Sequence, residues 1–173
     1  MMLKPQDLLV VLKLVAVGSK SWSYNKLAVE LNMSPSEVHA ACKRLLTVGL
    51  AVNKDKRITP QIRNLEEFII HGIKYVFAPK RGEMTRGMPT AYAAEPLVKL
   101  IVTDGEPLPV WPDANGEVRG STFVPLYKSA PEAAKRDTDL YQMLALVDAI
   151  RGGRAREREL AIEQIKQRFQ QYG

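Results

Sequence analysis

Residues 23–58 read SYNKLAVELNMSPSEVHAACKRLLTVGLAVNKDKRI, and this stretch contains the local signals for two helices and two short strands. Ser23 is a favourable N-cap, because its hydroxyl can accept a hydrogen bond from a backbone N–H of the first helical turn. We therefore expect a helix over 24–31. The three residues 32–34 that follow leave room only for a tight connector. The order of these signals predicts a helix, a short turn and a second helix.

The second helix of this stretch has clear start and stop signals. Ser34 is followed by Pro35 and then by Glu37, which gives the S-x-x-E pattern of a capping box with proline at the first helical position. Gly49 is expected to end the helix. Small or apolar residues that recur at helical spacing predict its buried face. These residues are Val38, Ala41, Cys42 and Leu45.

A basic hairpin is predicted after this helix. Residues 50–52 and 57–58 favour short strands, and the polar residues 53–56 form the expected turn between them. A helix-turn-helix that reads DNA needs a small residue where its helices cross, a tight turn, and a second helix with a polar or basic exposed face. Ala28 is the candidate for the small residue. The residues that we expect at the DNA are Ser34, Ser36, His39, Lys43, Arg44 and Thr47 on or before the second helix, and Lys54, Lys56 and Arg57 on the hairpin.

This stretch resembles the winged-helix superfamily of bacterial regulators, the MarR-like group in particular. The matching residues are Leu27-Ala28-x-x-Leu31-x-Met33-Ser34-Pro35-Ser36-x-Val38 and Leu45-x-x-x-Gly49-Leu50. The resemblance implies a homodimer that binds pseudo-palindromic DNA. The chain departs from the MarR-like pattern in its short hairpin and in the proline-rich segment that separates the helices expected to dimerise. A C-terminal string, residues 144–158, is similar to tails of helix-turn-helix proteins from toxin–antitoxin or phage-defence loci, which implies a regulator or antitoxin role.

The positive charge of the chain is concentrated in its first third. The formal net charge is +6, and residues 1–60 hold nine Lys or Arg against four Asp or Glu, a net of +5. Residues 61–128 are neutral and residues 129–173 carry +1. Charge polarised in this way favours a polyanionic partner for the first third, although a solvated basic surface would have the same composition.

We expect a mainly α chain with short β elements, an α+β fold. Its expected parts are a winged helix-turn-helix DNA-binding domain over 1–71, a proline-rich, irregular or β extension over 72–137, and a C-terminal helical region for dimerisation or partner binding over 138–173. Nine of the eleven prolines lie between Pro60 and Pro131, and that density excludes long helices and central strands there.

Short elements are predicted inside the proline-rich part. The segments expected to be extended are 74–77, 97–102 and 117–127, with a two-residue turn at Asn115-Gly116. A helix is expected from a cap at Asn64 to about residue 70.

The two ends of the chain are predicted to be helical and apolar. The helix over 6–17 has apolar residues on nearly every face, and helices over 138–150 and 155–169 form a hairpin that needs a cover. That cover could be the N-terminal helix, a second protomer or both, so we expect a homodimer. Asp148, which interrupts an apolar stripe, is expected to pair with Arg151 or a nearby arginine.

The sequence shows no pattern of a catalytic or metal site. There is no phosphate-binding glycine motif, no nucleophile elbow, and only one cysteine and two histidines. Cys42 is interpreted as a small core residue in preference to a redox sensor. We expect no enzyme activity and no cofactor, and we expect a cytoplasmic protein without a membrane span or signal peptide.

The functional hypothesis is a sequence-specific regulator of transcription that binds double-stranded DNA, as a homodimeric repressor or an antitoxin-like autoregulator. The alternative is an adaptor subunit that uses the winged helix and the C-terminal helices to bind a protein partner. The exposed face of the helix after residue 34 distinguishes the two, because it is polar and basic where a protein-binding face would be apolar.

Overall fold

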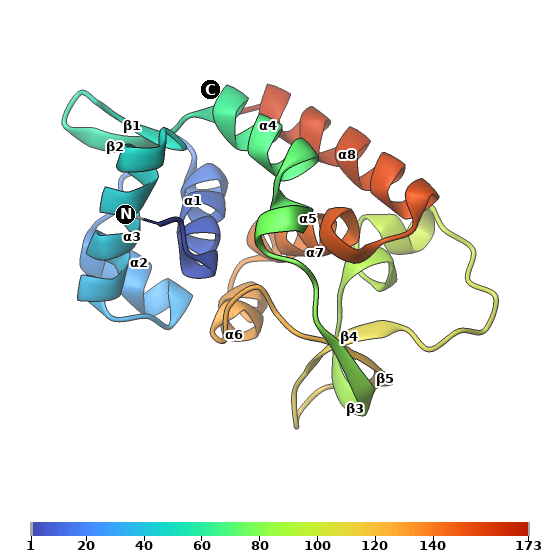
Figure 1. Cartoon of the computed structure of the whole chain (residues 1–173). Coiled ribbons are helices and arrows are strands. Elements are labelled where there is room, and N and C mark those ends of the chain that lie inside the picture. Colours follow the sequence, from blue (N-terminus) through green and yellow to red (C-terminus); the bar gives the residue numbers. More distant parts are fainter. Residues whose placement is uncertain (1, 173) are drawn as a thin grey trace.

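The computed structural model describes residues 2–172 and is mainly helical, with two small sheets (Figure 1). Its helices are α1 (Pro5–Val17), α2 (Tyr24–Leu31), α3 (Pro35–Val48), α4 (Ile62–His71), α5 (Ile73–Val76), α6 (Ala130–Lys135), α7 (Thr138–Gly152) and α8 (Ala155–Gln170), with 3-10 turns η1 (Ala91–Ala93) and η2 (Leu97–Lys99). Its strands are β1 (Ala51–Lys54), β2 (Arg57–Pro60), β3 (Arg81–Pro89), β4 (Pro109–Pro112) and β5 (Val118–Phe123). No helix among the described residues is long and apolar enough to cross a membrane.

Helix α1 is the central element of the packing. Every residue from Asp7 to Leu14 is buried, as its apolar sequence predicts. The helix contacts α3 on one side and α7 on the other, and Figure 1 shows it between the blue N-terminal helices and the orange α7. Helix α7 is itself buried from Met143 to Arg151. The N-terminal helix of the same chain therefore provides cover that the terminal helices were expected to need.

The proline-rich part forms a small closed barrel. Strand β3 pairs antiparallel with both β4 and β5, and β4 pairs parallel with β5. Gly87 and Gly120 lie where the strands approach most closely, and a Cβ at either position would overlap the backbone carbonyl of Trp111 or Leu108. Pro109 is the first residue of β4, which is a position where a strand tolerates proline.

Two predictions for this part are wrong. Residues 74–77 lie mostly in α5, since they continue the helical path of α4 after Gly72, and a four-residue apolar run does not by itself separate strand from helix. Residues 97–102 begin as a 3-10 turn that buries Leu97. Asn115-Gly116 lies in a turn, as predicted: the Gly116 N–H donates to the Asp113 carbonyl at 2.9 Å, and the strands on either side are parallel.

Other boundaries differ less. Of residues 117–127, only 118–123 form a strand. Helix α4 begins at Ile62 and not after Asn64, because the Asn64 side chain instead donates a hydrogen bond of 2.8 Å to the carbonyl of Gly49. The predicted helices at the two ends are confirmed, and Gly152 and Gly153 mark the break between α7 and α8.

A buried carboxylate joins the barrel to the helices. Asp148 on α7 is 1% exposed, and its Oδ2 accepts hydrogen bonds from the Thr90 hydroxyl at 2.7 Å and from the Trp111 indole at 2.8 Å. Its Oδ1 accepts a hydrogen bond from Arg151 at 2.9 Å, which confirms the predicted pair. Burial raises the pKa of the Asp148 carboxyl, and Arg151 and the two neutral donors oppose that shift. Arg151 also donates to the carbonyl of Phe77 at 2.8 Å.

We expect Asp148→Asn to lower the free energy of unfolding by about 3–5 kcal/mol, because Arg151 would remain buried without a counter-charge. Urea unfolding followed by circular dichroism measures the change. The control is Glu159→Gln on the exposed part of α8, which should cost about 0.5 kcal/mol or less. Equal stabilities for the two variants would show that the buried network contributes nothing specific.

Candidate nucleic-acid interface

Helix α2 and the turn after it have the geometry that their sequence predicts. The Ser23 hydroxyl accepts a hydrogen bond from the Lys26 N–H at 3.1 Å. Asn32 ends α2 in the left-handed region, with φ 54°, and the chain reverses there. Met33 is buried next to this turn, and its N–H donates to the carbonyl of Ala28, which is also buried. The turn is thus fixed against the core and brings α3 back across α2.

The first turn of α3 carries the predicted capping box. The Ser34 N–H donates to Oε2 of Glu37 at 2.7 Å, and the Glu37 N–H donates to the Ser34 hydroxyl at 3.2 Å. The second oxygen of Glu37 accepts a hydrogen bond from the Tyr127 hydroxyl at 2.8 Å. The Ser34 N–H and Tyr127 together hold the pKa of Glu37 below its ordinary value. Helix α3 is therefore anchored at its start both locally and to a segment 90 residues away.

Opposite faces of α3 differ as predicted. The four residues expected on its buried face, Val38, Ala41, Cys42 and Leu45, are all buried. Its exposed residues include the predicted Ser36, His39, Lys43 and Thr47, with Ser34 just before the helix, and also Pro35 and Val48 at its two ends. The His39 ring stacks on the Tyr24 ring with 3.6 Å between centroids, so its orientation is set by α2. The Thr47 hydroxyl donates to the Lys43 carbonyl at 3.0 Å.

The hairpin after α3 is tighter than predicted. Strands β1 and β2 pair as far as Lys54 and Arg57, so only Asp55 and Lys56 form the turn. Both turn residues have positive φ, 53° and 62°, which is the geometry of a type I′ turn. The side chains of Lys54 and Lys56 are exposed at the tip.

Arg44 has an internal partner. Its guanidinium donates two hydrogen bonds of 2.8 Å to the two oxygens of Asp7 on α1, and the Asp7 side chain is fully buried. This two-point contact raises the pKa of Arg44 and joins α3 to α1. The signal for it is Asp7 itself, because a single carboxylate inside an otherwise apolar helix needs a buried partner.

Arg57 is also engaged within the chain. Its guanidinium donates to the carbonyls of Gly18, Ser19 and Lys20 in the connection between α1 and α2. Arg57 thus holds the base of the hairpin against that connection. The guanidinium groups of both arginines are thus bonded within the chain, whereas the side chains of the candidate residues Lys43, Lys54 and Lys56 are exposed.

Two of the four acidic groups of the first third form ion pairs, Glu37 is held by uncharged donors and Asp55 is exposed, whereas the lysines are mostly exposed. Asp7 is bound to Arg44, Glu30 forms an ion pair of 3.1 Å with buried Lys13, and Glu37 is bound to the cap and to Tyr127. Six lysines are exposed and form no ion pair within residues 2–172: Lys4, Lys20, Lys26, Lys43, Lys54 and Lys56. Sequence reasoning did not single out Lys20 and Lys26, because nothing local distinguishes them from other surface lysines.

Across the part of the chain that the structure describes, no group of three or more His, Cys, Asp or Glu side chains could hold a metal ion. Comparisons of the chain with protein-family models, with curated proteins and with solved structures give no match. The interface is therefore argued from its own geometry and charge.

Arg44→Ala is expected to reduce stability by about 3–5 kcal/mol, because it leaves the Asp7 carboxylate buried without its counter-charge. Lys43→Ala, one residue earlier and exposed, is the matched control and should change the free energy of unfolding by about 0.5 kcal/mol or less. Thermal and urea unfolding of both variants give the comparison. If Arg44→Ala were as stable as Lys43→Ala, the Asp7 contact would not be a structural one.

Cys42 should be unreactive in the folded protein. Burial, with a smaller contribution from Asp7, raises the pKa of its thiol to about 11. At pH 8 the reactive thiolate is then about one molecule in a thousand, against roughly one in four for an unfolded thiol of pKa about 8.5. Labelling by iodoacetamide should be at least about 100-fold slower without urea than in it. Labelling at the same rate in both conditions would contradict the core interpretation.

Proposed function

We propose that this chain is a sequence-specific regulator that binds duplex DNA through a winged helix-turn-helix formed by α2, α3 and the β1–β2 hairpin. The observation that carries the proposal is the division of charge in the first third. Three of its four carboxylates, those of Asp7, Glu30 and Glu37, are held by internal contacts, while Asp55 is exposed in the hairpin turn. Six of its seven lysines are exposed, and four of these lie on α2, α3 and the hairpin tip. A polar, basic helix face next to a basic hairpin is the arrangement that a DNA-reading unit needs.

Helix α3 would supply the base contacts. Ser36, His39 and Lys43 recur at spacings of three and four residues, so they share one face of the helix. Lysine can donate to the N7 and O6 acceptors of guanine, and serine can serve several bases. The stacking of His39 on Tyr24 reduces the conformational freedom that the imidazole would lose on binding.

The hairpin would supply backbone contacts. Lys54 precedes the turn and Lys56 is one of its two left-handed residues, and Arg57 holds the base of the hairpin against the α1–α2 connection. A rigid basic tip of this kind can hold a phosphate without reading sequence. In this proposal α3 provides the sequence specificity, and the hairpin provides affinity that does not depend on sequence.

The proposed assembly on DNA is a pair of copies, each at one half-site, because one such unit makes few base contacts. The apolar faces of α1 and α7 are largely covered within the chain, so they do not by themselves require a partner. The two copies would therefore associate through other surfaces or through the DNA. A MarR-like repressor or an antitoxin-like autoregulator is the class of protein that this arrangement fits.

The test begins with selection of genomic fragments on the immobilised full-length protein, which defines a preferred duplex. Lys43→Ala should weaken binding to that duplex by about 1–3 kcal/mol and change binding to scrambled DNA little. Lys56→Ala should weaken both duplexes alike and reduce the slope of log K against log salt by about one. A salt titration by fluorescence anisotropy measures both quantities.

The control for these variants is Lys166→Ala, which removes an exposed lysine from α8, outside the proposed interface. It should bind both duplexes like the unmodified protein. If Lys43→Ala and Lys56→Ala also bind unchanged, α3 and the hairpin do not contact DNA. The adaptor hypothesis would then replace the present one.

A further inference from the structure

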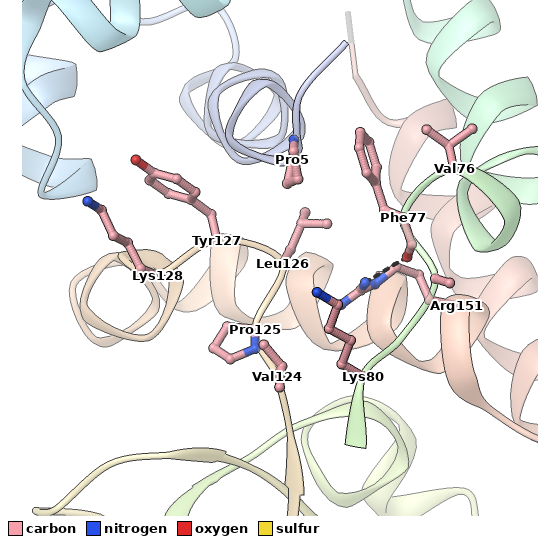
Figure 2. A pocket seen from close by; sticks show the side chains of 11 residues that line it. Pro5, Val76, Phe77, Lys80, Val124, Pro125, Leu126, Tyr127, Lys128 and Arg151 are labelled. Atoms are coloured by element: carbon pink, nitrogen blue, oxygen red, sulfur yellow. Dashed lines mark hydrogen bonds between the residues drawn. The ribbon is translucent and has the colours of Figure 1, made fainter. Parts of the chain in front are cut away.

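An open cleft of about 530 Å³ lies between the start of α1, the segment after α5 and the segment after β5 (Figure 2). Pro5 lines it from α1, and Val76 and Phe77 line it from the end of α5. Residues 124–128, which connect β5 to α6, form the facing wall. The volume is in the range of sites for small organic molecules.

The cleft is positively charged. Three of its lining residues are the cations Lys80, Lys128 and Arg151, of which Arg151 is paired with Asp148, and none of its lining residues is acidic. Lys80 and Lys128 are exposed and form no ion pair within residues 2–172. On the Tyr127 side, the Glu37 carboxylate accepts hydrogen bonds from Tyr127 and from the cap of α3 and interacts electrostatically with Lys128.

Arg151 gives the cleft a buried polar group without a protein partner. Its side chain is 4% exposed, and two of its nitrogens are used, one by Asp148 and one by the carbonyl of Phe77. Its Nε is buried and has no hydrogen-bond partner among the described residues. An unsatisfied buried donor costs free energy, which a bound acceptor or an ordered water would recover.

The other walls are apolar and partly open to solvent. Val76 and Val124 are 54% and 40% exposed, and Leu126 lies between the charged groups as Figure 2 shows. Exposed valines that line a cleft are a surface on which an apolar ligand body can bury area. The cleft therefore combines positive charge with an apolar lining, so its complement is a molecule with an anionic head and an apolar body.

We propose that this cleft is a binding site for a small organic acid. Its carboxylate would lie among the ammonium groups of Lys80 and Lys128 and the guanidinium side of Arg151. Its apolar body would pack on Val76 and Val124. Inorganic anions would use only the charged part of the cleft, and neutral apolar molecules only the other part, so neither matches the whole surface.

The experiment uses 2-naphthoate and its neutral isostere 2-naphthamide as probes, with isothermal titration calorimetry on the full chain. Naphthoate should bind one molecule per chain at least about tenfold more tightly than naphthamide, because only the acid gains charge-assisted hydrogen bonds. No DNA is present, so the outcome does not depend on the proposed function. No saturable naphthoate binding below about 1 mM, or equal affinity for the two probes, would overturn the proposal.

Two variants locate the binding. Lys80→Ala/Lys128→Ala should weaken naphthoate binding at least about tenfold and leave naphthamide unchanged. Val124→Glu, at a half-exposed position, should abolish naphthoate binding by placing a like charge on the wall. The control Lys99→Ala/Lys166→Ala removes two exposed lysines elsewhere and should change nothing. A control that weakens binding as much as the cleft variants would show non-specific charge attraction and overturn the site.

Discussion

The buried carboxylate of Asp148 is the contact on which the arrangement of the middle of the chain depends. It receives hydrogen bonds from Thr90 and Trp111, which belong to the proline-rich part, and from Arg151 on its own helix. Through Arg151 it also fixes the carbonyl of Phe77, where the chain leaves α5 for β3. The small barrel has few strands and little core of its own, so these directional bonds determine where it sits on α7. They also place the Arg151 side chain at the cleft.

A second buried ion pair has the same role in the first third of the chain. Asp7 and Arg44 join α1 to α3 as Asp148 joins α7 to the barrel. Both pairs use arginine, which tolerates burial better than an ammonium does. Arg44 donates twice to Asp7, whereas Arg151 donates once to Asp148 and once to the Phe77 carbonyl. Lysines are distributed differently, since most of those in the first third remain in water. The surface of the first third is basic because cations outnumber carboxylates there and six of its seven lysines are exposed.

Signals that act over a few residues predict the helices, whereas contacts between residues distant in the sequence leave no signal that could be recognised. The caps at Ser23 and Ser34 and the periodic apolar face of α3 act over a few residues, so α2, α3 and their exposed side chains could be predicted. The partners of Arg44 and Arg57 lie 37 to 39 residues away and could not be paired from spacing alone. The barrel could not be predicted because β4 has only four residues and the nine residues of β3 show no alternation of buried and exposed positions.

The hydrogen bond between Tyr127 and Glu37 has a consequence for cooperativity. One oxygen of Glu37 belongs to the cap of its own helix and the other to a connection formed only when the barrel is in place. Opening of that connection would therefore remove half of the support from the first turn of α3, while the rest of the helix stayed packed on α1. Amide exchange in that turn would follow the barrel and not the helix. Residues 37 and 127 are therefore coupled, because a substitution at residue 127 removes or changes a hydrogen bond to the Glu37 carboxylate.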